Sequence, residues 1–173
     1  MKIGKNSTIG KTTKIIFPEN LVIGSNTRID DFCLLICKKK LIIGDYVHIA
    51  PHVILRSHEK LNIKDFTLIS SFVDIYTSID NISNKDVISH PIFKKNDKRN
   101  KPYSKSINIG KYCQIGSHST LFPGSNMQDG SVVGAHTIID FKTKKWNIYY
   151  GNPARQISKR NSKFVTNFFK KNS

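Results

Sequence analysis

The sequence predicts an all-β fold, a parallel β-helix in which short strands wind into a solenoid. A lead isoleucine recurs every twenty residues, at Ile3, Ile23, Ile43 and Ile63, and further aliphatic residues follow each lead at steps of six. A helix does not explain a step of six, because its apolar stripe recurs every three or four residues. A fixed period of this kind indicates a repeat architecture, in which each coil contacts only its neighbours.

The first coils occupy residues 1–79, and each contains three hexapeptides followed by a two-residue insertion. An ordinary β-sandwich of short strands is the alternative, but it predicts turns of irregular length instead of columns in constant register. Three such columns accompany the lead isoleucines: Ile9, Ile29, Ile49 and Ile69, then Ile15, Leu35, Leu55 and Ile75, and then Leu21, Leu41 and Leu61.

Residues 80–106 interrupt the repeat with irregular, polar sequence that contains Asp80 and the dipeptide His90-Pro91. A long loop without secondary structure of its own is usually functional or disordered. The loop leaves from the corner where earlier coils carry the two-residue insertion. We therefore expect it to project sideways and to reach a neighbouring subunit.

After the loop the repeat resumes at a strict step of six, with Ile109, Ile115, Leu121, Met127, Val133 and Ile139. Small or β-branched residues occupy a second column, four residues after each lead, which suits a narrow triangular prism. Cys33 and Cys113 belong to this column, and the three cysteines of the chain lack metal-ligand spacing. The position of Cys33 and Cys113 in the inward column indicates reduced core thiols.

The composition bounds the possible partners. A chain of 173 residues forms one domain with a substantial core. Its formal charge of +16 favours anionic ligands, but no recognition helix, zinc finger or RNA-binding motif accompanies the charge, so we expect no nucleic acid. Met1 leads straight into the first repeat, and no apolar run approaches the ~20 residues of a membrane span. We expect a cytoplasmic protein without stable membrane insertion.

Five segments carry a resemblance to a known family: Val73–Ser78, Ser106–Gly110, Gly116–Gly124, Asp129–Ala135 and Tyr150–Arg155. The last three read G-S-H-S-T-L-F-P-G, D-G-S-V-V-G-A and Y-G-N-P-A-R. The chain resembles the hexapeptide-repeat acyltransferases of the galactoside and maltose O-acetyltransferase group, and is most similar to the O-acetyltransferases of O-antigen and capsule sugars. The resemblance implies a left-handed β-helix over residues 1–140, with the extruded loop 80–106. Residues 141–173 would form a closing strand and a basic C-terminal helix or tail.

This resemblance implies an acetyl-CoA-dependent sugar O-acetyltransferase that modifies a surface polysaccharide or its precursor, as in lipopolysaccharide biosynthesis. It implies a homotrimer with active sites between subunits, and a sugar or nucleotide-sugar as acceptor. Coenzyme A would enter as the donor, and no metal is required.

Acyl transfer from a thioester to a hydroxyl or an amine needs a base for the acceptor's proton and donors for the oxyanion. The family uses a loop histidine followed by proline, which His90 matches, although it lies ten residues beyond the aligned position, Asp80. Asp80 itself could orient a histidine or bind a sugar hydroxyl. His48 is the second candidate base, on an outer edge between Arg28 and Leu68. His52 and His58 resemble ordinary surface positions.

By the same resemblance, pantetheine would contact the backbone of the C-terminal coils, and the adenosine end would meet basic and aromatic side chains. His118 and His136 are one coil apart and should stack on one face; a metal pair there would lack a third ligand. The candidate residues are Ser117, Gly134, Ala135, Trp146, Arg155 and Arg160 for the cofactor, and Tyr76 and His118 for the substrate.

Three other functions remain open. An N-acetyltransferase acting on a nucleotide-linked amino sugar would use the same scaffold and donor. A zinc enzyme of the γ-carbonic-anhydrase type would need three histidines across a subunit interface. A non-catalytic scaffold would not bind coenzyme A. The fold alone does not choose among these functions.

Overall fold

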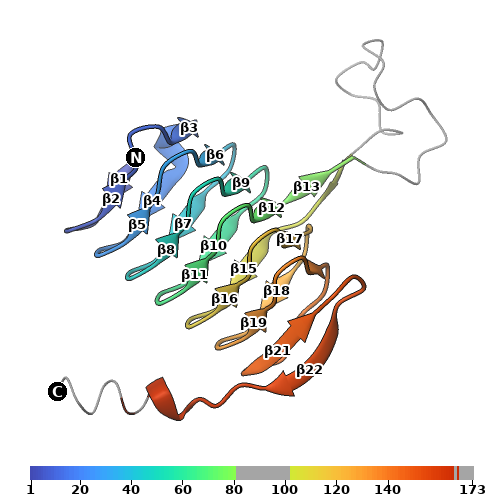
Figure 1. The fold of residues 1–173 in the computed structure, drawn as a ribbon. Helices are drawn as coiled ribbons and strands as arrows, with labels where there is room; N and C mark the ends of the chain where they lie inside the picture. The colour runs from blue at the N-terminus through green and yellow to red at the C-terminus, as the bar shows by residue number, and fades with distance from the viewer. Residues whose placement is uncertain (81–101, 166, 168–173) are drawn as a thin grey trace.

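The computed structural model describes residues 1–80, 102–165 and 167, and shows a solenoid with three parallel sheets that form the sides of a prism (Figure 1). The prediction of an all-β parallel solenoid is confirmed. Sheet A comprises β1 (Lys2–Ile3), β4 (Leu21–Ile23), β7 (Leu41–Ile43), β10 (Leu61–Ile63), β15 (Ile107–Ile109) and β18 (Asn126–Met127).

Sheets B and C complete the prism. Sheet B comprises β2 (Thr8–Ile9), β5 (Arg28–Ile29), β8 (His48–Ile49), β11 (Leu68–Ile69), β16 (Gln114–Ile115), β19 (Val132–Val133), β21 (Asn147–Tyr150) and β22 (Arg155–Lys159). Sheet C comprises β3 (Lys14–Ile16), β6 (Leu34–Ile36), β9 (Ile54–Arg56), β12 (Asp74–Tyr76), β17 (Thr120–Leu121) and β20 (Ile138–Ile139). A short 3₁₀ helix, η1 (Pro18–Asn20), lies at a corner of the first coil.

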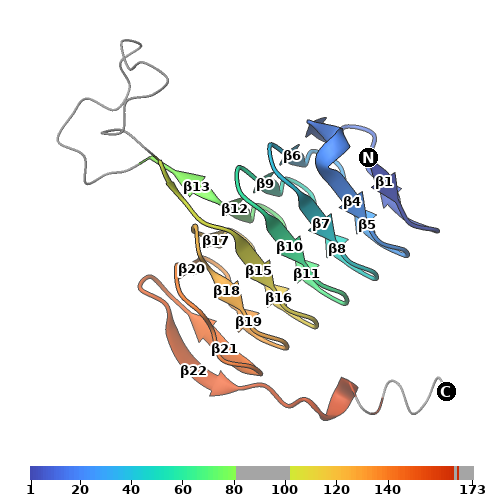
Figure 2. The ribbon, with the colours of Figure 1, turned by 180° about the vertical axis from the view of Figure 1, so that it is seen from behind.

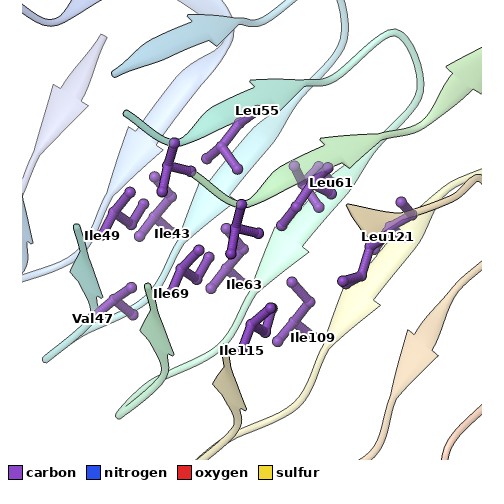
Figure 3. Packing of buried hydrophobic residues seen from close by; sticks show 14 of the residues in the cluster. Ile43, Val47, Ile49, Leu55, Leu61, Ile63, Ile69, Ile109, Ile115 and Leu121 are labelled. Atoms are coloured by element: carbon purple, nitrogen blue, oxygen red, sulfur yellow. The ribbon is translucent and has the colours of Figure 1, made fainter. Parts of the chain in front are cut away.

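The core repeats one aliphatic side chain per hexapeptide, as the sequence predicts. Ile49, Ile69 and Ile115 follow one another along sheet B, and neighbouring columns from sheets A and C meet them in the interior (Figure 3). These side chains are fully buried. Because every coil buries the same positions, the prism is held by stacked layers, each of which depends on its two neighbours.

The interruption leaves the coil register intact. Leu61 pairs with Ile107 and Ile75 pairs with Leu121, so the strands before and after the loop stack as consecutive coils. The loop leaves through an antiparallel stem of β13 (Ser78–Ile79) and β14 (Tyr103–Ser104), which projects from the side of the prism (Figure 2). Residues 81–101, with His90, lie outside the described residues.

Hydroxyl groups in the small inward column tie successive coils together. Thr27 Oγ1 donates to the Gly44 carbonyl at 2.8 Å and accepts from the Val47 N–H at 3.0 Å. Thr67 Oγ1 donates to the Gly110 carbonyl at 3.0 Å and so bridges the interruption. The small side chains therefore fill the narrow corner and also satisfy backbone groups there.

The C-terminal end of the prism closes with an antiparallel pair, β21 and β22. The strand β22 directly follows Ala154, and the first helical residue after it is number 163. In the described part of the chain no helix is long and apolar enough to cross a membrane.

Candidate functional site

A polar cluster lies on the outer face of sheet B, where β5 and β8 pair Arg28 with His48. Arg28 Nε donates to Asp30 Oδ1 at 2.9 Å, and His48 Nε2 lies 2.8 Å from Asp30 Oδ2. Arg28 Nη2 also lies 2.7 Å from the same His48 nitrogen. The side chain of His48 is 35% exposed and that of Asp30 is 25% exposed, so solvent and ligands reach both.

The two contacts to His48 Nε2 belong to alternative protonation states. With a hydrogen on Nε2 the ring donates to Asp30, and without one it accepts from Arg28. In the first state the carboxylate fixes the ring and leaves Nδ1 as the basic nitrogen, the arrangement that a general base needs. The structure thus gives His48, the second candidate base from sequence, an orienting carboxylate that sequence reasoning did not identify. The period of twenty could have indicated it, because Asp30 directly follows the lead Ile29 beneath Ile49.

A second cluster lies on sheet C, beside the stem of the loop. The Tyr76 hydroxyl donates to Asp74 Oδ2 at 3.2 Å, and the Tyr76 ring packs 6.5 Å, centroid to centroid, from Phe122 in the next coil. Burial, together with the Asp74 carboxylate, raises the pKa of Tyr76, so its phenol stays protonated and acts as a donor. Asp80 is exposed just beyond β13, on the same side of the molecule.

The corner between sheets B and C carries a continuous stack of rings. His118 and His136 stack at 4.8 Å with an interplanar angle of 2°, as their one-coil spacing predicts. His52 lies in the same stack between Phe32 and Phe72, at 5.1 and 4.7 Å, so it is more than an isolated surface residue. Each ring stands three residues after its lead position, a column that the sequence register could have exposed: Phe32, His52, Phe72, His118 and His136.

The residues expected to meet pantetheine lie on this same corner, in the C-terminal coils. The Gly134 N–H donates to the Tyr149 carbonyl at 2.8 Å, and its carbonyl accepts from Ser119 Oγ at 2.8 Å, so both groups are engaged. Within the described residues the N–H groups of Ser117 and Ala135 donate no hydrogen bond. These two N–H groups are therefore available to a ligand along the corner.

Trp146 and Arg160 come together at a different corner, between sheets A and B. Arg160 Nη1 donates to the Tyr112 carbonyl at 2.6 Å and to the Gly130 carbonyl at 3.3 Å. Its guanidinium lies 6.0 Å from the centroid of the Trp146 ring. Arg160 thus holds the C-terminal segment against the prism, whereas Arg155, at the start of β22, is exposed.

An apolar cavity of about 500 Å³ lies where this C-terminal segment crosses sheet B. Arg160 contributes a polar group to its wall. The remaining lining residues are apolar or uncharged: Phe66, Leu68, Tyr112, Cys113, Gln114, Phe164 and Val165.

The cysteines do not provide a nucleophile. Cys33, Cys37 and Cys113 are free and buried, as expected for Cys33 and Cys113 from the inward column. Burial raises the pKa of Cys113 to about 12 and that of Cys37 to about 11, so both remain thiols at neutral pH. Among the described residues, no three His, Cys, Asp or Glu side chains are grouped so that they could hold a metal ion.

Comparison with known proteins places this geometry in a family. No protein-family model matches the chain. A point mutant of AntD, an N-acyltransferase from Bacillus cereus solved in complex with dTDP and coenzyme A, matches with a TM-score of 0.89 and 34% identity. The match covers 99% of this chain and 92% of that one.

Two curated proteins of Escherichia coli match shorter segments. The dTDP-4-amino-4,6-dideoxy-D-glucose acyltransferase is 31% identical over 97 residues, which are 56% of this chain and 49% of that protein. The galactoside O-acetyltransferase is 33% identical over 84 residues, 49% of this chain and 41% of that protein. The chain thus spans about half the length, or less, of the curated relatives that it matches.

The coils and the full-length match to AntD define a left-handed parallel β-helix of the hexapeptide-repeat class. The chain belongs to the hexapeptide-repeat sugar acyltransferases, the family that its sequence motifs resemble.

Proposed function

We propose that this protein transfers an acyl group from a coenzyme A thioester to the amino group of a nucleotide-linked sugar. The observation that carries the proposal is the extent of similarity to AntD, which spans 99% of the chain at 34% identity. AntD has been solved with dTDP-4-amino-4,6-dideoxyglucose and coenzyme A. The sequence motifs alone favour O-acetylation, but the match to the galactoside O-acetyltransferase covers 49% of the chain.

O-acetylation of a surface-polysaccharide sugar is the second candidate. It is supported by that 33% identity and by the coil motifs around Gly116–Gly124 and Asp129–Ala135. Both reactions use the same donor and differ in the acceptor atom. Either reaction fits a cytoplasmic enzyme, because acyl-CoA and nucleotide sugars are cytoplasmic metabolites.

The donor would lie along the corner between sheets B and C. There the unengaged N–H groups of Ser117 and Ala135 suit the amide carbonyls of pantetheine, and Gly134 directly precedes Ala135 in the same coil. Bound acyl-coenzyme A would supply the activated thioester carbonyl, and coenzyme A would leave as the free thiol. Arg155 is exposed and free to meet a phosphate of the donor, while Trp146 and Arg160 lie at the opposite edge of sheet B.

The acceptor's nitrogen must lose a proton during transfer, and a histidine is suited to take it. His90 is the proposed base, with His48, oriented by Asp30, as the second candidate. Tyr76 and His118 are the proposed substrate contacts, and Asp80 would assist at the loop stem.

A homotrimer would unite these groups. His48 lies on sheet B and Tyr76 on sheet C, two different faces of one prism. Side chains on two faces of one chain do not converge on a single substrate, whereas the faces of two adjacent copies do. The proposal therefore places the site in the cleft between subunits.

Steady-state assays with acetyl-CoA and 3-hydroxybutyryl-CoA test the proposal. The acceptor panel contains dTDP-4-amino-4,6-dideoxyglucose, other amino-sugar nucleotides, the matching hydroxyl sugars and simple galactosides. Free thiol release reports turnover, and the buried cysteines of the protein contribute little background. We expect turnover with amine acceptors. Turnover with hydroxyl acceptors alone would overturn N-acylation in favour of the second candidate, and no turnover with any acceptor would contradict both.

A further inference from the structure

Arg56 is a basic side chain on the outer face of sheet C that the sequence motifs do not include. It ends β9 and stands in register between Ile36 and Tyr76 of the neighbouring coils. Its guanidinium carbon lies 4.8 Å from the centroid of the Tyr76 ring. Its Nε is buried and has no hydrogen-bond acceptor among residues 1–80 and 102–165.

A buried nitrogen without an acceptor among the described residues distinguishes Arg56 from Arg28 and Arg160. Arg28 is paired with Asp30 at 2.9 Å, and Arg160 donates to two carbonyls of its own chain. Buried donors are nearly always satisfied, and an unsatisfied one is destabilising, more so when the group is charged. The guanidinium of Arg56 therefore keeps a donor that the described residues do not engage.

The charges around Arg56 favour an anion. Asp74, the nearest acid on the sheet, accepts from the Tyr76 hydroxyl and, among the described residues, no carboxylate lies within 4.0 Å of the Arg56 nitrogens. Burial, together with the charges of Lys38 and Arg56, lowers the pKa of His58 at the adjacent corner. Positive charge thus collects beside Tyr76, and the described part of the chain provides no carboxylate that pairs with Arg56.

We propose that Arg56 binds the phosphate of the nucleotide-linked acceptor sugar, with Tyr76 as the residue that positions its guanidinium. The planar fork of a guanidinium matches two phosphate oxygens, and stacking on an aromatic ring fixes the plane of that fork. Next to the phosphate position, the rings of Tyr76 and Phe122 offer faces on which the acceptor could stack. Asp74 offers an acceptor for hydroxyl groups of the sugar. This inference rests on the proposed function and adds to it a specificity-determining residue for nucleotide-activated acceptors.

Binding measurements by calorimetry test the inference without turnover. The probes are dTDP, UDP and GDP, with thymidine and coenzyme A for comparison, and the variants are Arg56→Gln and Arg56→Lys. Lys14→Gln is the matched control, because it removes one positive charge from the same face of sheet C at its far end. A charge-assisted hydrogen bond is worth ~1.5–3 kcal/mol, so Arg56→Gln should weaken diphosphate binding ~10–100-fold. Arg56→Lys should recover only part of that loss, and the affinities for thymidine and coenzyme A should not change.

The outcomes separate this inference from the proposed function. Unchanged diphosphate affinity in Arg56→Gln overturns the inference, even where the wild-type enzyme acylates amino-sugar nucleotides. A loss of affinity for coenzyme A alone would show that Arg56 contacts a phosphate of the donor, and this too would overturn the inference. A wild-type protein that binds none of the diphosphates would also overturn it. A change in the solution mass of Arg56→Gln at constant diphosphate affinity would assign Arg56 to a contact between copies of the chain.

If Arg56→Gln does not fold, Arg56→Lys and Tyr76→Leu provide the same comparison. Diphosphate binding through Arg56 without acyl transfer would support the inference while the proposed function fails.

Discussion

The indole ring of Trp146 lies directly on the backbone of Gly130, at a corner where the neighbouring coils carry side chains. Gly130 has φ of +71°, and a Cβ built on it would overlap the Trp146 ring. Tyr112 occupies the equivalent position in the preceding coil and stacks on Trp146 with centroids 6.2 Å apart. The glycine thus leaves room for the indole ring that closes the C-terminal end of the ladder.

Substitution of Gly130 by alanine should destabilise the fold. The added methyl group overpacks the site by ~1–3 kcal/mol, in addition to the cost of an alanine at positive φ. Gly124→Ala is the matched control, since Gly124 has φ of +90° but a Cβ there would meet the flexible Lys105 side chain at 3.1 Å and the Tyr103 hydroxyl at 3.9 Å. Urea unfolding monitored by circular dichroism gives the comparison. Equal losses in the two variants would show that the contact with Trp146 contributes nothing beyond backbone strain.

The hydrogen bond from Thr67 to the Gly110 carbonyl should help to hold the two parts of the solenoid together across the interruption. Thr67→Val keeps the shape but leaves that carbonyl without its 3.0 Å donor, so we expect a loss of ~1–3 kcal/mol. Thr8→Val, on an exposed outward position of β2, should change stability by less than ~0.5 kcal/mol. Equal unfolding midpoints for Thr67→Val and Thr8→Val would contradict this prediction and would indicate that water donates to the Gly110 carbonyl in place of Thr67.

Arg160 should act mainly as an anchor for the C-terminal segment. Loss of its bond to the Tyr112 carbonyl in Arg160→Ala should increase chymotrypsin cleavage at Phe164 ~10–100-fold, because local opening becomes easier. Lys159→Ala, on the neighbouring exposed residue, should leave the cleavage rate unchanged. A phosphate-binding role, as the family resemblance implies, would instead appear as a loss of discrimination between coenzyme A and dephospho-coenzyme A at constant cleavage rate.

The two candidate bases differ in what their removal should do. His90→Ala should lower kcat by at least ~100-fold if His90 is the general base. His48→Gln should then lower it less than ~10-fold, through the loss of the Arg28–Asp30–His48 cluster. His52→Gln, in the ring stack, serves as the control with near-normal turnover. A ~100-fold loss in His48→Gln with normal His90→Ala turnover would assign the base to His48.

The sequence by itself determined the coil architecture, because a prism buries one aliphatic residue at each step of six and every coil repeats the rule. It also placed the interruption at a corner, predicted the stacking of His118 on His136, and identified the family through motifs that span strands and corners of the later coils. All of these features follow from the position of each residue within the repeat, and that position can be read from the sequence period.

Only the tertiary structure decided which side chains are already engaged. The period of twenty brings Arg28 and Asp30 close to His48, but it does not show that both contact one nitrogen of that ring. The bonds of Arg160 to the Tyr112 and Gly130 carbonyls do not follow from spacing at all. The buried Arg56 nitrogen, which has no partner in the described part of the chain, could not be predicted either, since a repeat pattern does not show whether a polar group has a partner. The physical reason is that burial periodicity is a property of each coil, whereas hydrogen bonding and charge pairing depend on distances between side chains of different coils.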